Sequence, residues 1–378
     1  MKNVFGFNKI GENRALIKRC FEVPLFGRYF QNSIFALLII IFSICFASCE
    51  RTADPRTEAL MGTVCTVNAY EDGTKSLYDE LFARLHEIDE TFSVTIDSSE
   101  ISAINKAAGE RSVSVSSDTA YVVRSALAFA ELTGGAFDPT VGPLVKIWGI
   151  NTDHARVPEK SEIDAVLPLI NWRDVSVTED NTVMLKRRGM ALDLGGIVKG
   201  YAADELTKIL KARKVRRAIV DLGGNIFVYG KKKDGSPWRV GIKDPNDPEG
   251  VPAIVLNVAN STIVTSGVYE RFFTENGVRY HHILDAKTGY PAASGLLSST
   301  IVCESSMAAD ALSTSVFVLG KEGGMDLLRR IQSSSGAELP EVPGLHAQAL
   351  GIFIEEDGSV SASKALEGSL EAPAVRFE

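Results

Sequence analysis

The chain has 378 residues, of which 45% are hydrophobic and 23% charged, and its formal net charge at pH 7 is −8. This composition is that of a globular protein and excludes a collagen-like, low-complexity or disordered chain. An acidic chain without a basic, aromatic-rich patch also excludes nucleic acid as a partner, because such binding depends on Lys and Arg side chains that neutralise phosphates.

The first 48 residues have the pattern of an export signal. Basic side chains precede an apolar run from Ile34 to Phe46, which has the length of a signal-peptide core and is short for a membrane span. The run ends in Phe-Ala-Ser-Cys, and small residues before a cysteine resemble a bacterial lipoprotein cleavage box. We therefore expect residues 1–48 to be a signal peptide that is cleaved before a lipid-bearing Cys49. An uncleaved signal anchor is the alternative.

The rest of the chain is predicted to form one folded unit. Residues 49–59 are expected to be a tether, 60–356 the domain, and 357–378 a frayed tail because it is poor in apolar residues. Apolar spacing predicts helices at 77–91, 118–132, 161–169, 197–213, 305–319 and 323–331. Strands are expected at 60–70, 175–178, 183–186, 190–193, 217–221, 226–229, 238–243, 254–258 and 349–354. No Pro/Ser-rich linker divides residues 60–356, so the prediction is a single α+β domain.

Two cysteines, Cys65 and Cys303, follow the predicted lipid-bearing Cys49. Both stand in apolar, strand-like segments. One pair does not make a disulfide framework, so we expect two buried thiols.

The segment from Gly189 to Asp204, GMALDLGGIVKGYAAD, places a carboxylate, two glycines and a lysine at the start of a predicted helix. Asp193 ends a short predicted strand, glycines 195 and 196 form the turn, and Lys199 follows in the first helical turn. Free N–H groups at a helix N-terminus favour anions, and glycine lets a ligand approach the backbone. The segment predicts an anion site; an ordinary strand–turn–helix is the alternative.

Asp310 and Thr314 share one face of the predicted helix at 305–319, because they are four residues apart. Carboxylate and hydroxyl oxygens are ligands suited to Mg²⁺, which also retains waters and substrate phosphates. The alternative is a solvated helix face. The apolar residues around Asp310 place it near the core, where a carboxylate needs a partner.

A pair of histidines, His281 and His282, lies in the string YHHILDAKTGYP. In a strand the two rings would point to opposite faces, so they would not form one metal site. One of them could be a general base and the other structural, or both could be structural. Neither a P-loop nor a G-x-G-x-x-G fingerprint occurs in the chain.

These strings, taken in order over residues 60–330, resemble the ApbE family of FAD:protein FMN transferases. The matching strings are MGT at 61–63, FS…SEI…N at 92–105, GGAFDPTVGPL..IWG at 134–149, DLGGIVKGYAAD at 193–204, DLGGN at 221–225, W..GI.DP at 238–245, TSG.YER at 265–271, HHILD..TG.P at 281–291 and M.ADALST at 307–314.

The resemblance implies a single compact α+β domain, related to the T-fold, with mixed helices and a largely antiparallel sheet. It implies an enzyme that uses Mg²⁺ to cleave the pyrophosphate of FAD. FMN would pass to a Thr or Ser hydroxyl of a target protein, and AMP would be released. Family acceptors include subunits of Rnf- and Nqr-type redox complexes. The family and the leader together imply a lipid-anchored protein on the periplasmic side of the inner membrane.

The family's functional residues map onto this chain by motif. Asp310, Thr314 and the carbonyl of Gly196 match the Mg²⁺ ligands. His282 matches the essential histidine, and its ordinary pKa suits a general base. The flavin-nucleotide contacts fall at Met61, Ala136, Phe137, Asp138, Asp193, Lys199 and Leu284.

Two positions depart from the family pattern. Thr95 stands where many members have a tyrosine that stacks on the cofactor, and Ser313 stands where some have another acidic residue at the metal site. Two rival functions remain beside the transferase: an Mg²⁺-dependent FAD pyrophosphatase that releases AMP and FMN, and a flavin-binding lipoprotein without catalysis.

Overall fold

The structure is a computed structural model, and it describes residues 52–333, 342, 345, 349–372 and 374–378. The predicted signal peptide, residues 1–48, and the predicted lipid site at Cys49 lie outside the described residues. Among the helices that are described, none combines the length and the apolar character needed to cross a membrane.

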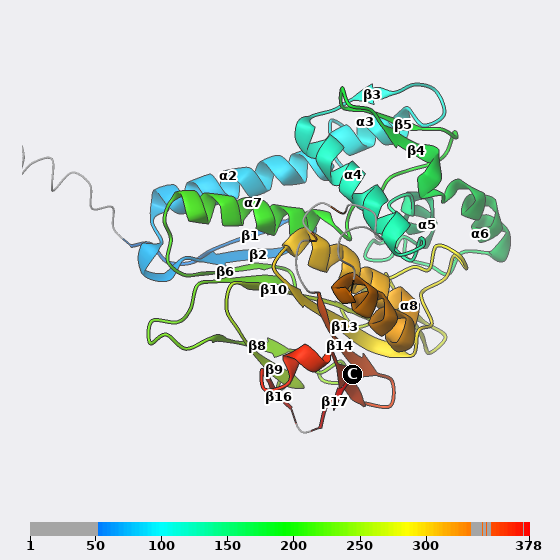
Figure 1. Ribbon diagram of the computed structural model, residues 1–378. Helices are drawn as coiled ribbons and strands as arrows, with labels where there is room; N and C mark the ends of the chain where they lie inside the picture. Colours follow the sequence, from blue (N-terminus) through cyan, green and yellow to red (C-terminus); the bar gives the residue numbers. More distant parts are fainter. Residues whose placement is uncertain (1–51, 334–341, 343–344, 346–348, 373) are drawn as a thin grey trace, which may run out of the picture. The chain divides into compact units, whose positions relative to one another are not determined.

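A mainly antiparallel sheet organises the domain (Figure 1). Within the described residues it has nine strands in the order β1-β2-β6-β7-β10-β13-β14-β15-β17, and only β15 and β17 pair in parallel. Its end strands are not paired with each other, so the sheet is open. The strands are β1 Arg56–Leu60, β2 Thr63–Asn68, β6 Ala218–Leu222, β7 Asn225–Tyr229, β10 Ser261–Gly267, β13 Leu296–Cys303, β14 Leu350–Glu355, β15 Val360–Ala362 and β17 Arg376–Phe377.

Three long helices cover one face of this sheet: α2 (Lys75–Phe92), α7 (Val198–Ala212) and α8 (Ser306–Ser333) (Figure 1). Their apolar residues recur at helical spacing and form the main core with the sheet. The backbone of α8 is interrupted at Gly320, whose φ is 73°. This break separates the two helices that the sequence predicts at 305–319 and 323–331.

A second, three-stranded sheet covers the opposite face. It consists of β8 (Trp238–Ile242), β9 (Ile254–Val258) and β16 (Leu370–Glu371). Trp238 and Leu256 of this small sheet belong to a second core with Ile263 and Ile352 of the large one. The central strands of the large sheet are therefore buried on both faces.

The remaining helices and strands gather beside the helix layer, and of these α5 contributes residues to the wall of the cavity described below. They are α3 (Glu100–Lys106), α4 (Ser117–Leu132), α5 (Gly142–Trp148), α6 (Lys160–Val166), the small sheet of β3 (Val113–Ser114), β5 (Thr182–Leu185) and β4 (Val175–Val177), and the hairpin of β11 (Phe272–Glu275) and β12 (Val278–His281). Trp148 is fully buried in a third core with Leu144, Ile163 and Leu284. This core fixes α5 against the segment that follows β12.

The predicted tether and tail are both corrected by the structure. Residues 56–60 form β1, which pairs with β2 in a hairpin, so the folded unit begins before residue 60. Beyond residue 356 the chain forms β15, β16 and β17, with Ala362 and Leu366 buried. Short strands are stabilised here by pairing with the existing sheets, which a low local content of apolar residues does not reveal.

One further strand prediction was wrong, and the central strands β10 and β13 were missed. Residues 190–193 form no strand but a single bridge, from Ala191 to Val141. Strand β13, at the centre of the sheet, was not predicted at all. It is buried on both faces and has Ser and Thr in its middle, so it lacks the alternation by which a strand is identified. Cys65 and Cys303 are buried free thiols, as expected.

Candidate functional site

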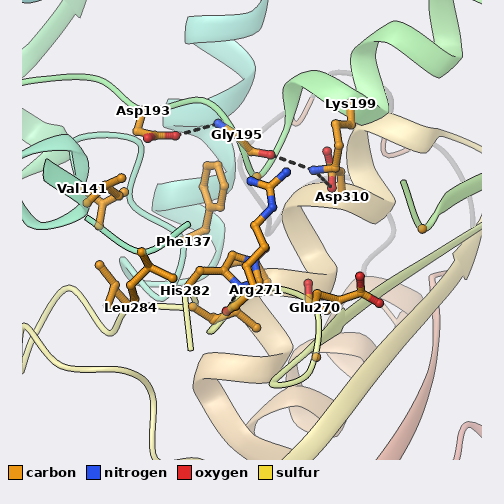
Figure 2. A pocket seen from close by; sticks show the side chains of 18 of the residues that line it. Phe137, Val141, Asp193, Gly195, Lys199, Glu270, Arg271, His282, Leu284 and Asp310 are labelled. Atoms are coloured by element: carbon orange, nitrogen blue, oxygen red, sulfur yellow. Dashed lines mark hydrogen bonds and ion pairs between the residues drawn. The ribbon is translucent and has the colours of Figure 1, made fainter. Parts of the chain in front are cut away.

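A cavity of about 430 Å³ lies where the loop before α5, the start of α7, the first turns of α8 and the segment after β12 meet (Figure 2). Small-molecule sites typically have about 300–1,000 Å³. Its lining includes Gly62, Thr63, Ala136, Phe137, Asp138, Val141, Asp193, Gly195, Gly196, Lys199, Gly223, Gly224, Asn225, Ser266, Glu270, Arg271, His282, Ile283, Leu284, Asp310 and Thr314.

The two ends of the cavity differ in character. Val141 and Leu284 mark an apolar end, and Lys199 and Asp310 lie on the opposite side, with Phe137 between them (Figure 2). An aromatic ring system suits the first end and a charged group suits the second.

The start of α7 holds a chain of polar contacts. Asp193 Oδ1 accepts a hydrogen bond from the Gly195 nitrogen at 2.9 Å, which shapes the turn. Lys199 Nζ donates to the Gly195 oxygen at 2.9 Å and lies 3.4 Å from Asp310 Oδ1. The Gly200 nitrogen donates to the other oxygen of Asp310 at 3.0 Å. The ammonium thus stands between a main-chain oxygen and a buried carboxylate, which is a position suited to a cation.

The start of α7 is held close to α8 by a glycine. A Cβ on Gly200 would lie 2.2 Å from the main-chain oxygen of Ser306, so only glycine allows this approach. Asp310 is 3% exposed. A carboxylate at this depth is stabilised by the Gly200 N–H and the Lys199 ammonium, since a buried charge requires partners.

The oxygen donors beside Asp310 fit a hard divalent cation. A Cβ at Gly196 would stand 3.4 Å from Thr314 Oγ1, so the glycine backbone and this hydroxyl are adjacent. Among the described residues no group of three His, Cys, Asp or Glu side chains comes together. An ion here would therefore be coordinated by one carboxylate, one hydroxyl and a backbone oxygen. Substrate phosphates and water would complete its coordination shell, which is the arrangement that Mg²⁺ prefers.

The loop before α5 is stabilised by Asp138. Its carboxylate accepts hydrogen bonds from the Thr140 nitrogen (2.8 Å), the Thr140 hydroxyl (2.6 Å) and the Trp172 nitrogen (3.2 Å). Burial raises the pKa of the Asp138 carboxyl above its ordinary value. Asp138 lines the cavity, but its oxygens are engaged by the protein and hold Ala136 and Phe137 in place.

His282 presents its ring to the cavity (Figure 2). Its Nδ1 lies 3.2 Å from the main-chain oxygen of Arg271. Because a carbonyl oxygen only accepts hydrogen bonds, Nδ1 carries the proton and Nε2 keeps a free lone pair. Burial, with smaller contributions from the charges of Arg271 and Lys199, lowers the pKa of His282 to about 3. The expectation of an ordinary pKa was wrong, since the ring is partly buried in the cavity wall and is influenced by two cations.

His281 lies in a different environment. It is buried, its ring meets Phe317 edge to face at 5.5 Å between centroids, and its Nδ1 accepts from the Ile283 nitrogen at 3.3 Å. Burial lowers the pKa of His281 to about 4. The residue is absent from the cavity lining, so of the two histidines only His282 can meet a ligand there.

The structure brings together nearly all of the residues that the motifs suggested. His282, Ala136, Phe137, Asp138, Asp193, Lys199, Leu284, Gly196, Asp310 and Thr314 line one cavity, although their roles stay predictions. Met61 does not line it; this residue has a φ of 51° in the β1–β2 turn, and Gly62 and Thr63 line the wall instead. Thr95 is exposed and also lies outside the lining.

Sequence reasoning missed several residues at the charged end, above all Asn225, Glu270 and Arg271. They stand in the strings DLGGN and TSG.YER, which carry the resemblance but received no roles. Their position at the ends of strands was the available signal, since side chains there gather at one edge of a sheet.

Comparisons with known proteins agree with this arrangement. A family model described as the ApbE family matches residues 61–337. The chain belongs to the ApbE family. An FAD:protein FMN transferase of Treponema pallidum is 38% identical over 340 residues, which cover 85% of this chain and 90% of that protein. One of Klebsiella pneumoniae is 34% identical over 272 residues, which cover 72% and 84%.

Solved ApbE structures share the fold. The ApbE protein of Thermotoga maritima has a TM-score of 0.73 at 32% identity, covering 83% of this chain and 98% of that one. The flavin transferase ApbE of Vibrio cholerae has a TM-score of 0.70 at 29% identity, covering 83% and 97%. The expected single domain of mixed helices and sheet, the α+β class, is confirmed.

Proposed function

We propose that this protein is an FAD:protein FMN transferase. It attaches FMN to a Thr or Ser hydroxyl of a target protein and releases AMP. One observation carries the proposal: a neutral imidazole with a free nitrogen, His282, lines the same cavity as the ion pair of Lys199 and Asp310. The relatives named above as FAD:protein FMN transferases support the same activity.

The transfer is a displacement at phosphorus. The hydroxyl oxygen of the acceptor forms a bond to the phosphorus of the FMN half, and the bond from that phosphorus to the bridging oxygen breaks. The bridging oxygen leaves with AMP. Nε2 of His282 takes the hydroxyl proton. The low pKa of His282 keeps its imidazole unprotonated in the ligand-free protein. The negative charge of a bound pyrophosphate would offset the positive charges of Arg271 and Lys199, and this would raise the pKa of His282 and make it a stronger base.

We further propose Mg²⁺ as the metal, held by Asp310, Thr314 and backbone oxygen at Gly196. When bound, Mg²⁺ supplies positive charge to the pyrophosphate. The protein's own residues bind and orient the rest of the substrate. Lys199 binds phosphate, while Phe137, Val141 and Leu284 bind a ring of FAD at the apolar end and exclude water from it.

The proposal also covers the protein that accepts FMN and the location of the enzyme in the cell. The acceptors are subunits of Rnf- or Nqr-type redox complexes or other flavinylated proteins, and the enzyme is anchored by a lipid on Cys49 at the periplasmic side of the inner membrane. The small residues before Cys49 support the anchor.

Incubation of residues 50–378 with FAD, Mg²⁺ and a candidate acceptor subunit tests the function. AMP together with an acceptor heavier by FMN, found by mass spectrometry, is the expected result. AMP without modification of any acceptor identifies an FAD pyrophosphatase, in which water replaces the hydroxyl. Tight binding of FAD without AMP identifies a carrier and contradicts catalysis.

A further inference from the structure

A buried carboxamide without a hydrogen-bond partner lies in the wall of the cavity. Asn225, the first residue of β7, is 0% exposed, and neither Oδ1 nor Nδ2 has a partner among the described residues. Leaving such groups unpaired is costly, and native proteins rarely do so. The other buried unpartnered side-chain atoms of the described residues lie outside the lining of the cavity.

Strand register places Asn225 near Asp310. Ser266 of β10 forms a hydrogen bond of 2.9 Å with Ser313 of α8, so alternate residues of β10, including Val264, face α8. Asn225 stands directly opposite Val264 and shares that face. Asp310 precedes Ser313 by one helical turn on the side of α8 that meets the sheet. The carboxamide therefore lies under the charged end of the cavity, away from Val141 and Leu284.

The turn that leads into Asn225 borders open space in the cavity. The two residues before Asn225 are glycines, and a Cβ at Gly224 would meet no atom within 4 Å. Asp221 Oδ1 already accepts from the Gly224 nitrogen at 3.1 Å, which orders this turn. Lys199 and Arg271 add positive charge to the same cavity. An anionic group with oxygen acceptors fits this combination of charge, open space and a free N–H donor.

We propose that Asn225 binds a phosphoryl oxygen of the nucleotide through Nδ2. This assignment rests on the proposed function, because FAD supplies the pyrophosphate. Asn225 would then be a phosphate-binding residue, whose Nδ2 is unpaired in the free protein and paired in the complex. The free protein bears the cost of the unpaired carboxamide, and the ligand recovers it on binding.

The test separates phosphate binding from ring binding. Titration with ADP reports on the pyrophosphate and titration with riboflavin on the flavin ring, and neither ligand can undergo FMN transfer. Asn225→Leu, which has a similar shape, should bind FAD and ADP roughly 10- to 100-fold more weakly, the effect of a lost hydrogen bond to a charged group. Binding of riboflavin should change less than about twofold. Asn225→Asp should lose the same ligands, because it replaces the donor by a negative charge.

Stability of the free protein gives a second, independent readout. Since both polar atoms of Asn225 are unpartnered, Asn225→Leu should melt at the same temperature as the native protein or higher. Ser298→Ala is the matched control: Ser298 is also buried with an unpartnered hydroxyl but lies outside the cavity lining. It should show the same behaviour in melting and unchanged binding of ADP.

Three results would overturn the inference. They are a melting temperature several degrees lower for Asn225→Leu, equal loss of riboflavin and ADP binding, and ADP binding that is unchanged in both Asn225 variants. A native protein that binds neither FAD nor ADP would instead contradict the proposed function.

Discussion

The main-chain oxygen of Arg271 accepts two hydrogen bonds from His282. The main-chain nitrogen of His282 donates to it at 3.0 Å, and Nδ1 of the imidazole donates to it at 3.2 Å. Arg271 immediately precedes β11 and His282 immediately follows β12, so the β11–β12 hairpin closes on this contact. The hairpin therefore positions the proposed base and selects its tautomer.

Replacing each histidine in turn separates catalysis from packing. His282→Ala should reduce transfer roughly 10²- to 10⁴-fold, the range for loss of a general base. His281→Ala should mainly lower the melting temperature, because it removes a buried ring that packs on Phe317. Initial rates of AMP release per folded enzyme measure the first effect and thermal denaturation the second. Equal, small losses of rate in both variants would show that His282 has a structural role and is not the general base.

Both histidines should make the fold sensitive to mild acid. Their pKa values are lowered to about 4 for His281 and about 3 for His282, from an ordinary value of 6.5. Below pH 6.5 the unfolded chain therefore binds protons that the folded chain does not, and stability falls as the pH falls. Between pH 7 and 5 we expect a loss of about 1–2 kcal/mol for each histidine.

Urea denaturation at pH 7, 6 and 5 measures this loss. His281→Leu should have a shallower dependence on pH than the native protein, by the contribution of one histidine. The same slope in both proteins would show that His281 is not the buried neutral group found here.

Asp310→Asn tests the metal site without removing the contact to α7. The amide keeps an acceptor for the Gly200 nitrogen but loses the charge that attracts a cation. We expect cleavage of FAD to fall by at least about 10²-fold, since charge stabilisation by a bound metal contributes several kcal/mol. The rate of AMP release, measured at increasing concentrations of Mg²⁺, checks this loss.

Asp310→Ala serves as the comparison for stability. It should also lose activity, but it leaves the Gly200 N–H unpaired and should cost about 1–3 kcal/mol more stability than Asp310→Asn. Full activity of either variant would remove Asp310 from the metal site.

Two adjacent glycines at the charged end of the cavity, Gly223 and Gly224, show how a close contact affects stability, because only one of them has a neighbour that a Cβ would meet. Gly223 and Gly224 have φ values of 64° and 88°, so alanine is strained at both, by about 1–2 kcal/mol. A Cβ at Gly223 would also lie 1.9 Å from Thr63 Oγ1, whereas one at Gly224 would meet nothing within 4 Å. Gly223→Ala should therefore be less stable than Gly224→Ala by a further ~1–3 kcal/mol. Thermal melts of both variants check this, and equal destabilisation would contradict the tight contact with Thr63.

The sequence by itself determined the long helices, the α+β class and most of the residues around the cavity, but not the short helices α3 and α5. Helices such as α2 and α7 are local, and their apolar residues recur with a period that can be counted along the chain. The turn at Gly195 and Gly196 and the spacing of Asp310 and Thr314 are equally local. Ordered motifs of this kind gave the resemblance to the ApbE family, which the comparisons confirm.

Only the tertiary structure decided what depends on neighbours distant in sequence. Strand β13 is stabilised by partners on both sides and by layers on both faces, so its own residues do not show a strand pattern. The pKa of His282 is set by burial and by Arg271 and Lys199. The unpaired carboxamide of Asn225 is likewise invisible in a sequence, because a missing partner is a property of the space around a side chain. Periodicity and turn residues act over a few positions, whereas burial, charge and hydrogen-bond satisfaction are fixed only when the whole chain has folded.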